Sequence, residues 1–206
     1  TMKALASRDP EFYFVVGETS RSPRPSEQDG VDLHFRSRDA ILADLKAGAL
    51  NQVVVGANGD LYCTSVDNFS SSQTNLFPLI PLGVGQFRAL PLKSFAAAFI
   101  VPDSFENWQN WLREQAAEGN WNEEKRQQRL LEAKSSFEFA LKDSKIRFVL
   151  NDNPETAAKR LKQVAEGRVP DDETRAKEIA KTSYDKLLKL LNPVKILDKL
   201  SINGAG

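Results

Sequence analysis

Two arginines stand three residues apart in a segment that proline keeps out of helical structure. Arg21 and Arg24 are interleaved with Pro23 and Pro25, and proline fixes φ and disfavours helix at the residue before it. The sequence therefore predicts a stiff turn that holds both guanidinium groups on one loop. A guanidinium group presents a planar fork of N–H donors that matches phosphate or carboxylate oxygens. This spacing indicates a site that binds an oxyanion.

Composition argues against several other kinds of chemistry. The chain has 206 residues with 28 basic and 28 acidic side chains, so no net field favours nucleic acid or an anionic membrane. Its single cysteine, Cys63, excludes an internal disulfide framework, and its single histidine, His34, leaves little room for histidine-based zinc chemistry. No apolar run approaches the ~20 residues of a membrane span, and no signal-peptide core stands near the N-terminus. We expect a soluble, cytoplasmic protein.

Hydrophobic periodicity predicts alternating helices and strands, which is typical of an α/β fold with a parallel sheet. Helices are expected over residues 2–8, 39–47, 104–115, 123–141, 153–167 and 173–191. Strands are expected over residues 12–16, 52–55, 61–64, 76–82, 96–101 and 147–150. Ser104 or Asp103 is expected to cap the third helix, and Asn153 the fifth, with Pro154 at its first position. Residues 58–60 predict a tight turn.

The arginine loop belongs to a longer pattern. Residues 19–35 read TSRSPRPSEQDGVDLHF. This segment resembles the monophosphate-binding segment of guanylate kinases, which reads roughly T-T-R-x-P-R-x-G-E-x-[DN]-G-x-D-Y-x-F. The matched positions are Thr19, Arg21, Pro23, Arg24, Glu27, Asp29, Gly30, Asp32 and Phe35. The resemblance implies that the oxyanion is the phosphate of a nucleoside monophosphate.

Further landmarks of that family follow in the same order. They are G-D-L-Y-C-T at 59–64, L-G-V at 82–84, F-I-V-P-D-S at 99–104, E-E-x-x-x-x-R-L at 123–130 and V-L-N-D at 149–152. The resemblance implies a P-loop kinase-like core with an inserted β-rich monophosphate-binding lobe and a helical lid. It places the family domain at 1–168, the lobe at about 19–64 and the lid at about 114–131.

The resemblance also assigns roles to single residues, because phosphoryl transfer depends on alignment and on neutralising phosphate charge. Arg21, Arg24 and Tyr62 would hold the acceptor monophosphate. Thr64 would contact the edge of the base. Arg129, on the lid, would reach the transferring phosphoryl group, and Asn151 would border the adenine of ATP. ATP and Mg²⁺ are the implied donor and metal.

Residues 169–206 form a C-terminal helical extension in this interpretation. Lysine and apolar residues alternate there with helical spacing, so the segment could bind a membrane surface or a partner. We expect it to pack on its own domain or on a neighbouring subunit, such as a second copy of the chain.

The chain departs from the family pattern on the ATP side. It contains no G-x-x-x-x-G-K-[ST] sequence, the loop that cradles ATP phosphates with backbone N–H groups. In the family that loop directly precedes the first helix, so residues 1–3 align at or just past its end. Either the loop lies upstream of this sequence or the protein has lost it, and we expect the former. The lid also has Glu118 where the family has an arginine.

The base-reading positions depart as well. The serine, glutamate and aspartate that recognise guanine in the family align with Gly17, Val53 and Pro78. An acid that pairs with guanine N–H groups discriminates steeply, whereas apolar walls do not. Glu18 or Gln52, one residue out of register, could compensate. Ile80 and Leu33 also replace an acid and a phosphate-contacting tyrosine.

Two functions from different classes fit this mixture. The first is a guanylate kinase-like enzyme that transfers a phosphoryl group from ATP to GMP or to an altered acceptor. The alternative is a catalytically inactive module that uses the retained arginines to bind a phosphorylated ligand or protein. A structural relic that binds nothing is a third possibility.

Overall fold

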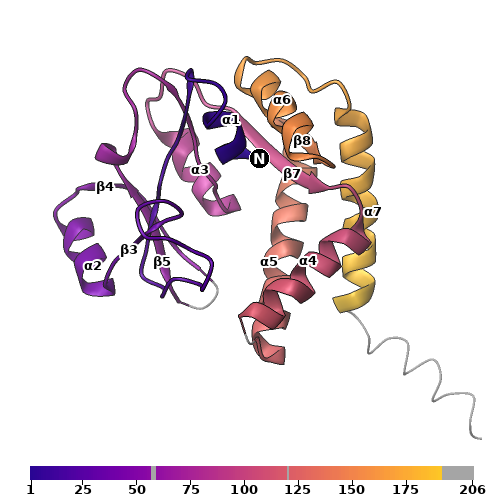
Figure 1. The fold of residues 1–206 in the computed structure, drawn as a ribbon, viewed down its shortest axis with the longest axis horizontal. Helices are drawn as coiled ribbons and strands as arrows, with labels where there is room; N and C mark the ends of the chain where they lie inside the picture. Colours follow the sequence, from indigo (N-terminus) through magenta and orange to yellow (C-terminus); the bar gives the residue numbers. More distant parts are fainter. Residues whose placement is uncertain (57–58, 120, 192–206) are drawn as a thin grey trace, which may run out of the picture.

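A computed structural model describes residues 1–56, 59–119 and 121–191. Helices and strands alternate along the chain (Figure 1). The helices are α1 (Met2–Ala6), α2 (Arg38–Lys46), α3 (Pro81–Ala89), α4 (Phe105–Glu118), α5 (Glu123–Lys142), α6 (Pro154–Ala165) and α7 (Glu173–Leu191), with a 3-10 turn at Val66–Asn68. The strands are β1 (Phe12–Phe14), β2 (Glu18–Thr19), β3 (His34–Phe35), β4 (Leu50–Val55), β5 (Leu61–Ser65), β6 (Thr74–Leu76), β7 (Ala97–Pro102) and β8 (Ile146–Asn151). Residue 58 of the predicted turn and residues 192–206 of the predicted extension lie outside the described residues.

The strands form three sheets within the described part of the chain. β1 pairs with β6 in parallel, and β7 pairs with β8 in parallel. β3, β2, β5 and β4 form a mixed sheet in that order. The mixed sheet and α2 make a lobe that stands beside the helix-rich half (Figure 1). The predicted α/β class is confirmed, with parallel pairing in the two two-stranded sheets and between β2 and β3 of the mixed sheet.

Alternating side chains of β8 bind the helical half together. Val149 faces α6 in one buried cluster, whereas Phe148 and Leu150 face the opposite side, in a cluster with α5 and α7. This alternation is the period of two that a strand buried on both faces requires. α1 and α6 also bury β1 and β6, and Ile100 of β7 packs against that cluster. Helix α6 therefore packs against both of these two-stranded sheets.

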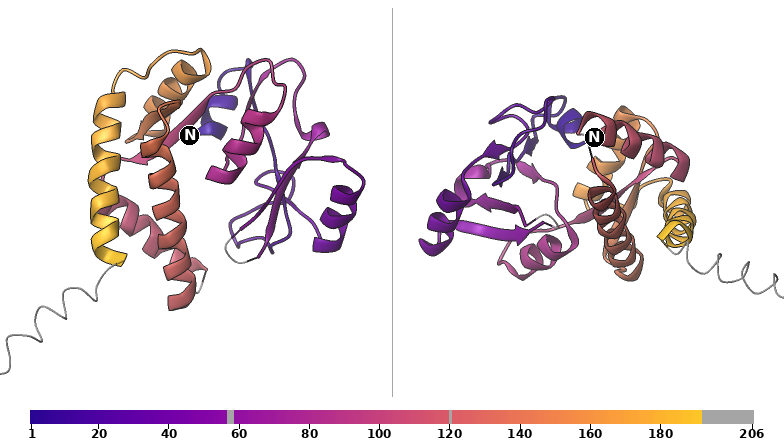
Figure 2. Two further views of the ribbon diagram at one scale, coloured as in Figure 1. Left: turned by 180° about the vertical axis from the view of Figure 1, so that it is seen from behind. Right: turned by 90° about the horizontal axis from the view of Figure 1, so that it is seen from below.

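Helix α7 is part of that core. Ala176, Ala180 and Leu187 are fully buried in the cluster around β7 and β8, and the helix lies alongside α5 (Figures 1 and 2). The small alanines allow close approach, and Leu187 fills the space between strands and helix. No helix among the described residues is long and apolar enough to cross a membrane.

One predicted element is wrong. The apolar run at 76–82 predicts a strand, but β6 ends at Leu76 and α3 begins at Pro81. Short apolar runs do not distinguish a strand from a buried helix. The local signal for the helix is Pro81, which occupies the first turn of α3. Proline is favoured there because the backbone N–H that it lacks would have no partner within the helix.

The helix starts follow their capping residues. Ser104 is the N-cap of α4, and its hydroxyl accepts a hydrogen bond from the backbone N–H of Asn107 at 3.1 Å. Asn153 caps α6 in the same way, with 2.8 Å between its Oδ1 and the Glu155 nitrogen. Asn122 caps α5. These caps fix where α4 and α5, which line the site described below, leave their loops.

Candidate functional site

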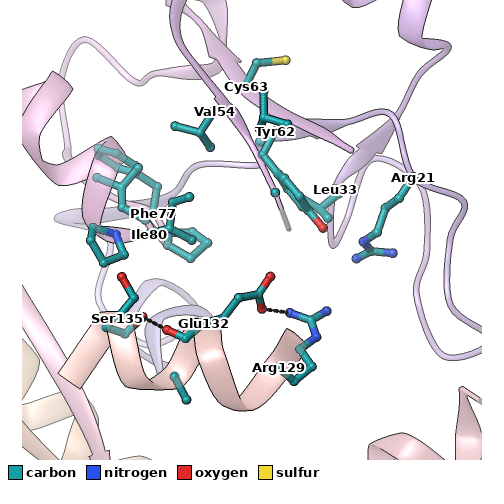
Figure 3. Close-up of a pocket in the computed structure, with 18 of the residues that line it drawn as sticks. Arg21, Leu33, Val54, Tyr62, Cys63, Phe77, Ile80, Arg129, Glu132 and Ser135 are labelled. Atoms are coloured by element: carbon teal, nitrogen blue, oxygen red, sulfur yellow. Dashed lines mark hydrogen bonds and ion pairs between the residues drawn. The ribbon is translucent and has the colours of Figure 1, made fainter. Parts of the chain in front are cut away.

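A cavity of about 650 Å³ separates the lobe from α4 and α5 (Figure 3). One wall comes from β2, β4, β5 and the segment before α3, and the other from α4 and α5. We call it the first cavity. Five of the six predicted site residues line it: Arg21, Arg24, Tyr62, Thr64 and Arg129. The volume is in the range that small-molecule ligands occupy in proteins.

Arg21 is held in place by Glu27. Two parallel hydrogen bonds of 2.6 Å join Nη1 and Nη2 of Arg21 to the two carboxylate oxygens of Glu27. Burial alone would lower the pKa of the Arg21 guanidinium, and its bonds to Glu27 outweigh that effect and raise it. The guanidinium also lies over the Phe35 ring, with its Cζ 5.4 Å from the ring centroid. Arg21 is therefore a preorganised cation.

The acids of the arginine loop shape its backbone. Glu27 accepts a hydrogen bond from the Arg24 backbone N–H at 2.8 Å. Asp29 accepts one from the Phe35 N–H at 2.9 Å, and Asp32 accepts one from the Gln28 N–H at 2.9 Å. Each carboxylate therefore closes a turn that the sequence pattern alone did not explain.

The loop is also fastened to β5 at its start. The Thr19 hydroxyl donates to the Leu61 carbonyl at 2.9 Å, and the Leu61 N–H donates to the Ser20 hydroxyl at 2.9 Å. Thr19 is fully buried. These bonds place Arg21 close to Tyr62, which follows Leu61 on β5.

Arg129 reaches the first cavity from the opposite wall. Its Nη1 donates to Glu132, one turn further along α5, at 2.8 Å. Its guanidinium lies over Trp121, with 5.6 Å between Cζ and the ring centroid. Burial and the positive charges of Arg21 and Arg129 lower the pKa of the Arg24 guanidinium, so the three cations influence one another. Arginine stays protonated at any physiological pH, and the repulsion favours binding of an anion between them.

These cations gather at one end of the first cavity. Figure 3 shows the Arg21 guanidinium, the Tyr62 hydroxyl and Arg129 facing one space. We call this the charged end and define it by Arg21, Arg24, Tyr62 and Arg129. Three guanidinium groups and a phenol supply several N–H and O–H donors, which is the donor set that binds a phosphate group.

The other end of the first cavity is neutral. Figure 3 shows Val54, Phe77 and Ile80 on its wall, away from Arg21 and Arg129. Gln52 and Thr64 stand opposite each other on β4 and β5 and are 6% and 5% exposed. We call this the neutral end and define it by these five residues. The Thr64 hydroxyl is buried and has no hydrogen-bond partner among the described residues.

The register of β4 and β5 shows that Val53, which aligns with a guanine-recognising residue of the family, does not face the first cavity. Val53 pairs with Cys63, and both pack against Ile41 of α2. Side chains alternate across a strand, so Gln52 and Val54 face the first cavity and Val53 faces away. Gln52 lines the cavity, whereas Val53 does not.

Glu18, the other residue considered as a replacement acid, is already paired. Its carboxylate is buried and forms an ion pair with Arg36, which also donates to Asp44 of α2 at 2.6 Å. Its neighbour across the sheet, Cys63, has a thiol whose pKa burial raises to about 12. A thiol with that pKa is not a nucleophile at neutral pH.

Asn151 is not part of the first cavity. It lines a second cavity of about 510 Å³ next to β7 and α4, where its Oδ1 accepts a hydrogen bond from the Thr1 hydroxyl at 2.9 Å. Trp108 and Trp111 line both cavities. The two cavities are therefore neighbours. The role predicted for Asn151 stays a prediction.

Two residues that line the first cavity, Glu132 and Trp111, were not predicted from the sequence. Glu132 carries the carboxylate that pairs with Arg129, and the i, i+3 spacing on a predicted helix is the signal that could have found it. Trp111 is 53% exposed and lies at the first cavity. Trp108 does pack, edge to face against Phe137.

The lobe, the lid-like helices and the cluster of arginines define an α/β protein built to bind a phosphorylated small molecule. A family model for guanylate kinase matches residues 1–168. The chain is 33% identical over 164 residues to a guanylate kinase of Synechococcus sp. (strain JA-3-3Ab), covering 76% of this chain and 71% of that protein. It is 30% identical over 169 residues to a guanylate kinase of Schizosaccharomyces pombe, covering 79% and 80%.

The chain therefore belongs to the guanylate kinase family, and the family predicted from residues 19–35 is confirmed. Guanylate kinase 1 of Arabidopsis thaliana is 30% identical over 157 residues, which cover 74% of this chain and 40% of that longer protein. The crystal structure of guanylate kinase from Anaplasma phagocytophilum shares the fold with a TM-score of 0.58, at 20% identity and 79% coverage of each chain.

Proposed function

We propose that this chain carries the acceptor site and lid of a nucleoside monophosphate kinase that transfers a phosphoryl group from ATP to GMP or a related monophosphate. The observation that carries the proposal is the charged end of the first cavity. Its cations come from two walls that are far apart in the sequence, and they converge on a space suited to one phosphate group. A purely structural ion-pair network would not leave these groups lining an open cavity.

Each residue then has a distinct task. Arg21, preorganised by Glu27, holds the acceptor phosphate together with Arg24 and Tyr62. Arg129, on the opposite wall, neutralises charge on the transferring group when the walls approach. Closure of the walls would also exclude water from the reacting phosphates.

In this proposal the adenine of ATP lies in the second cavity, beside Asn151. The described residues hold no group of three or more His, Cys, Asp or Glu side chains that could bind a metal ion. Magnesium would accordingly enter bound to the ATP phosphates, since this ion keeps few protein ligands in kinases. A cytoplasmic location and a partner on the C-terminal helix remain part of the same proposal.

Calorimetric titration of the chain with GMP and with guanosine tests this function. The two ligands share the base and the sugar and differ only in the phosphate group. We expect GMP to bind at least about 100-fold more tightly, because charge-assisted hydrogen bonds to phosphate supply most of the affinity. Equal affinities, or no binding of GMP at millimolar concentration, would exclude the charged end as a monophosphate site.

A further inference from the structure

We infer that the neutral end reads the base of the acceptor through an amide and a hydroxyl, Gln52 and Thr64, and therefore accepts GMP, IMP and AMP with similar affinity. The inference rests on the proposed function, which directs the phosphate to the charged end and leaves the neutral end for the base. It concerns the substrate class of that site: purine nucleoside monophosphates in general.

Gln52 and Thr64 are placed so that their side chains can contact the same base. Gln52 lies directly across the β4–β5 ladder from Thr64, so their side chains leave the sheet on the same face. Both residues are nearly buried, and the Thr64 Oγ1 has no partner. A buried hydroxyl without a partner costs free energy, and a ligand in the cavity would supply the missing hydrogen bond.

Gln52 is also oriented by the start of α3. A Cβ atom added to Gly83 would stand 3.0 Å from the Gln52 Nε2 and 2.9 Å from Leu79 Cδ2. The glycine therefore leaves room for the amide beneath the first turn of the helix. The amide therefore lies close to Gly83 and Leu79, on the wall of the first cavity.

The acidic side chains that line the first cavity, within the described part of the chain, are already paired. Among the described residues that line the first cavity, Glu18 and Glu132 are the acidic ones. Glu18 is paired with Arg36, and Glu132 with Arg129. Both acids are therefore committed to arginine, and the reading groups that remain are neutral.

Neutral groups read purines differently from a carboxylate. A carboxylate can only accept hydrogen bonds, so it favours guanine, which presents two neighbouring donors, N1–H and the 2-amino group. An amide and a hydroxyl each donate and accept. By turning the amide, Gln52 can satisfy the N1–H of guanine or hypoxanthine, or the N1 acceptor and 6-amino donor of adenine. The pair therefore lacks the unpaired buried charge that would reject the wrong base.

The experiment is a set of calorimetric titrations of the chain with GMP, IMP and AMP, repeated on Gln52→Glu, Gln52→Leu and Thr64→Val. We expect the three affinities of the unaltered chain to lie within about tenfold of one another. Gln52→Glu should raise the preference for GMP over AMP by about tenfold to 100-fold, because a hydrogen bond to a charged acceptor is the stronger kind. Gln52→Leu should weaken all three nucleotides.

Thr64→Val separates binding from folding. Valine has the shape of threonine without the unpaired hydroxyl, so the melting temperature should not fall, whereas nucleotide affinity should drop about tenfold. This variant also serves if Gln52→Glu, with its buried carboxyl, fails to fold.

Three results would contradict the inference. GMP binding more than 100-fold tighter than IMP and AMP to the unaltered chain would overturn it alone. Unchanged affinities in both Gln52→Leu and Thr64→Val would do the same. Failure of all three nucleotides to bind would overturn the proposed function and this inference with it.

Discussion

The charged end and the neutral end of the first cavity differ in how their polar groups are paired before any ligand arrives. At the charged end, Arg21 and Arg129 each form an ion pair with a carboxylate of this chain, although the buried Arg21 Nε has no partner among the described residues. At the neutral end, the Thr64 hydroxyl has no partner among the described residues. The ion pairs fix the positions of the guanidinium groups at the charged end, whereas the Thr64 hydroxyl at the neutral end depends on a ligand for its hydrogen bond. The comparison indicates that the phosphate grip is preorganised and the base contact is adaptable.

Of the substitutions considered, Arg21→Ala at the charged end should have the largest effect on GMP affinity. We expect Arg21→Ala to weaken GMP binding by about 100-fold, since it removes a cation that contacts the phosphate and leaves Glu27 without its partner. Arg8→Ala is the matched control, because Arg8 is exposed and pairs with the exposed Glu155. Calorimetry measures both. An unchanged GMP affinity in a folded Arg21→Ala variant would contradict the claim that the charged end binds the phosphate through Arg21.

Glu27 gives the charged end a pH dependence of intermediate size. Its hydrogen bonds to Arg21 hold the pKa of Glu27 below the ordinary value of 4.5, with a further contribution from the Arg24 N–H. A lowered pKa in the folded state stabilises the fold above that ordinary value, and the stabilisation is lost as the pH falls through the folded pKa. Glu27→Gln should cost about 2 kcal/mol at neutral pH.

The free energy of unfolding, measured by urea titration from about pH 6 to about pH 3, should consequently fall less steeply in Glu27→Gln than in the unaltered chain. Glu123→Gln is the control, because the Glu123 carboxylate is 82% exposed and its ion pair is long. If Glu27→Gln and the unaltered chain lose stability in parallel, the Arg21–Glu27 pair does not organise the charged end.

Two glycines of α3 provide the smallest and sharpest test of the neutral end. Gly85→Ala meets no atom within 4 Å, so it should stabilise the protein by about 0.5–1 kcal/mol through helix propensity. Gly83→Ala has the same propensity gain but presses on Gln52 and Leu79, so we expect no net gain and about a threefold loss of nucleotide affinity. Thermal unfolding and calorimetry separate the two variants. Identical behaviour would mean that Gly83 does not position the amide.

Most helices and strands, and the residues of the charged end, could be predicted from the sequence because the signals for them lie close together in the chain. Caps such as Ser104 and Asn153 determine where helices begin, and the periodicity of residues 173–191 identifies α7. The arginine loop is a continuous motif, so its residues need no tertiary information. Patterns of this kind can be recognised in the sequence because each depends only on residues within a few positions.

The neutral end could not be predicted in the same way. Whether Gln52 or Val53 faces the first cavity depends on the pairing of β4 with β5, and the register shifts between Leu50 and Gln52. A one-residue shift moves every later side chain to the other face. The pairing of Glu18 with Arg36, and of Glu132 with Arg129, likewise emerges only from the packed structure.

A crystal structure of the chain with GMP would test the division of the first cavity most directly. We expect the phosphate group within hydrogen-bonding distance of Arg21, Arg24 and Tyr62, and the base between Gln52 and Thr64. A phosphate bound in the second cavity, or at the neutral end with the base among the arginines, would contradict it.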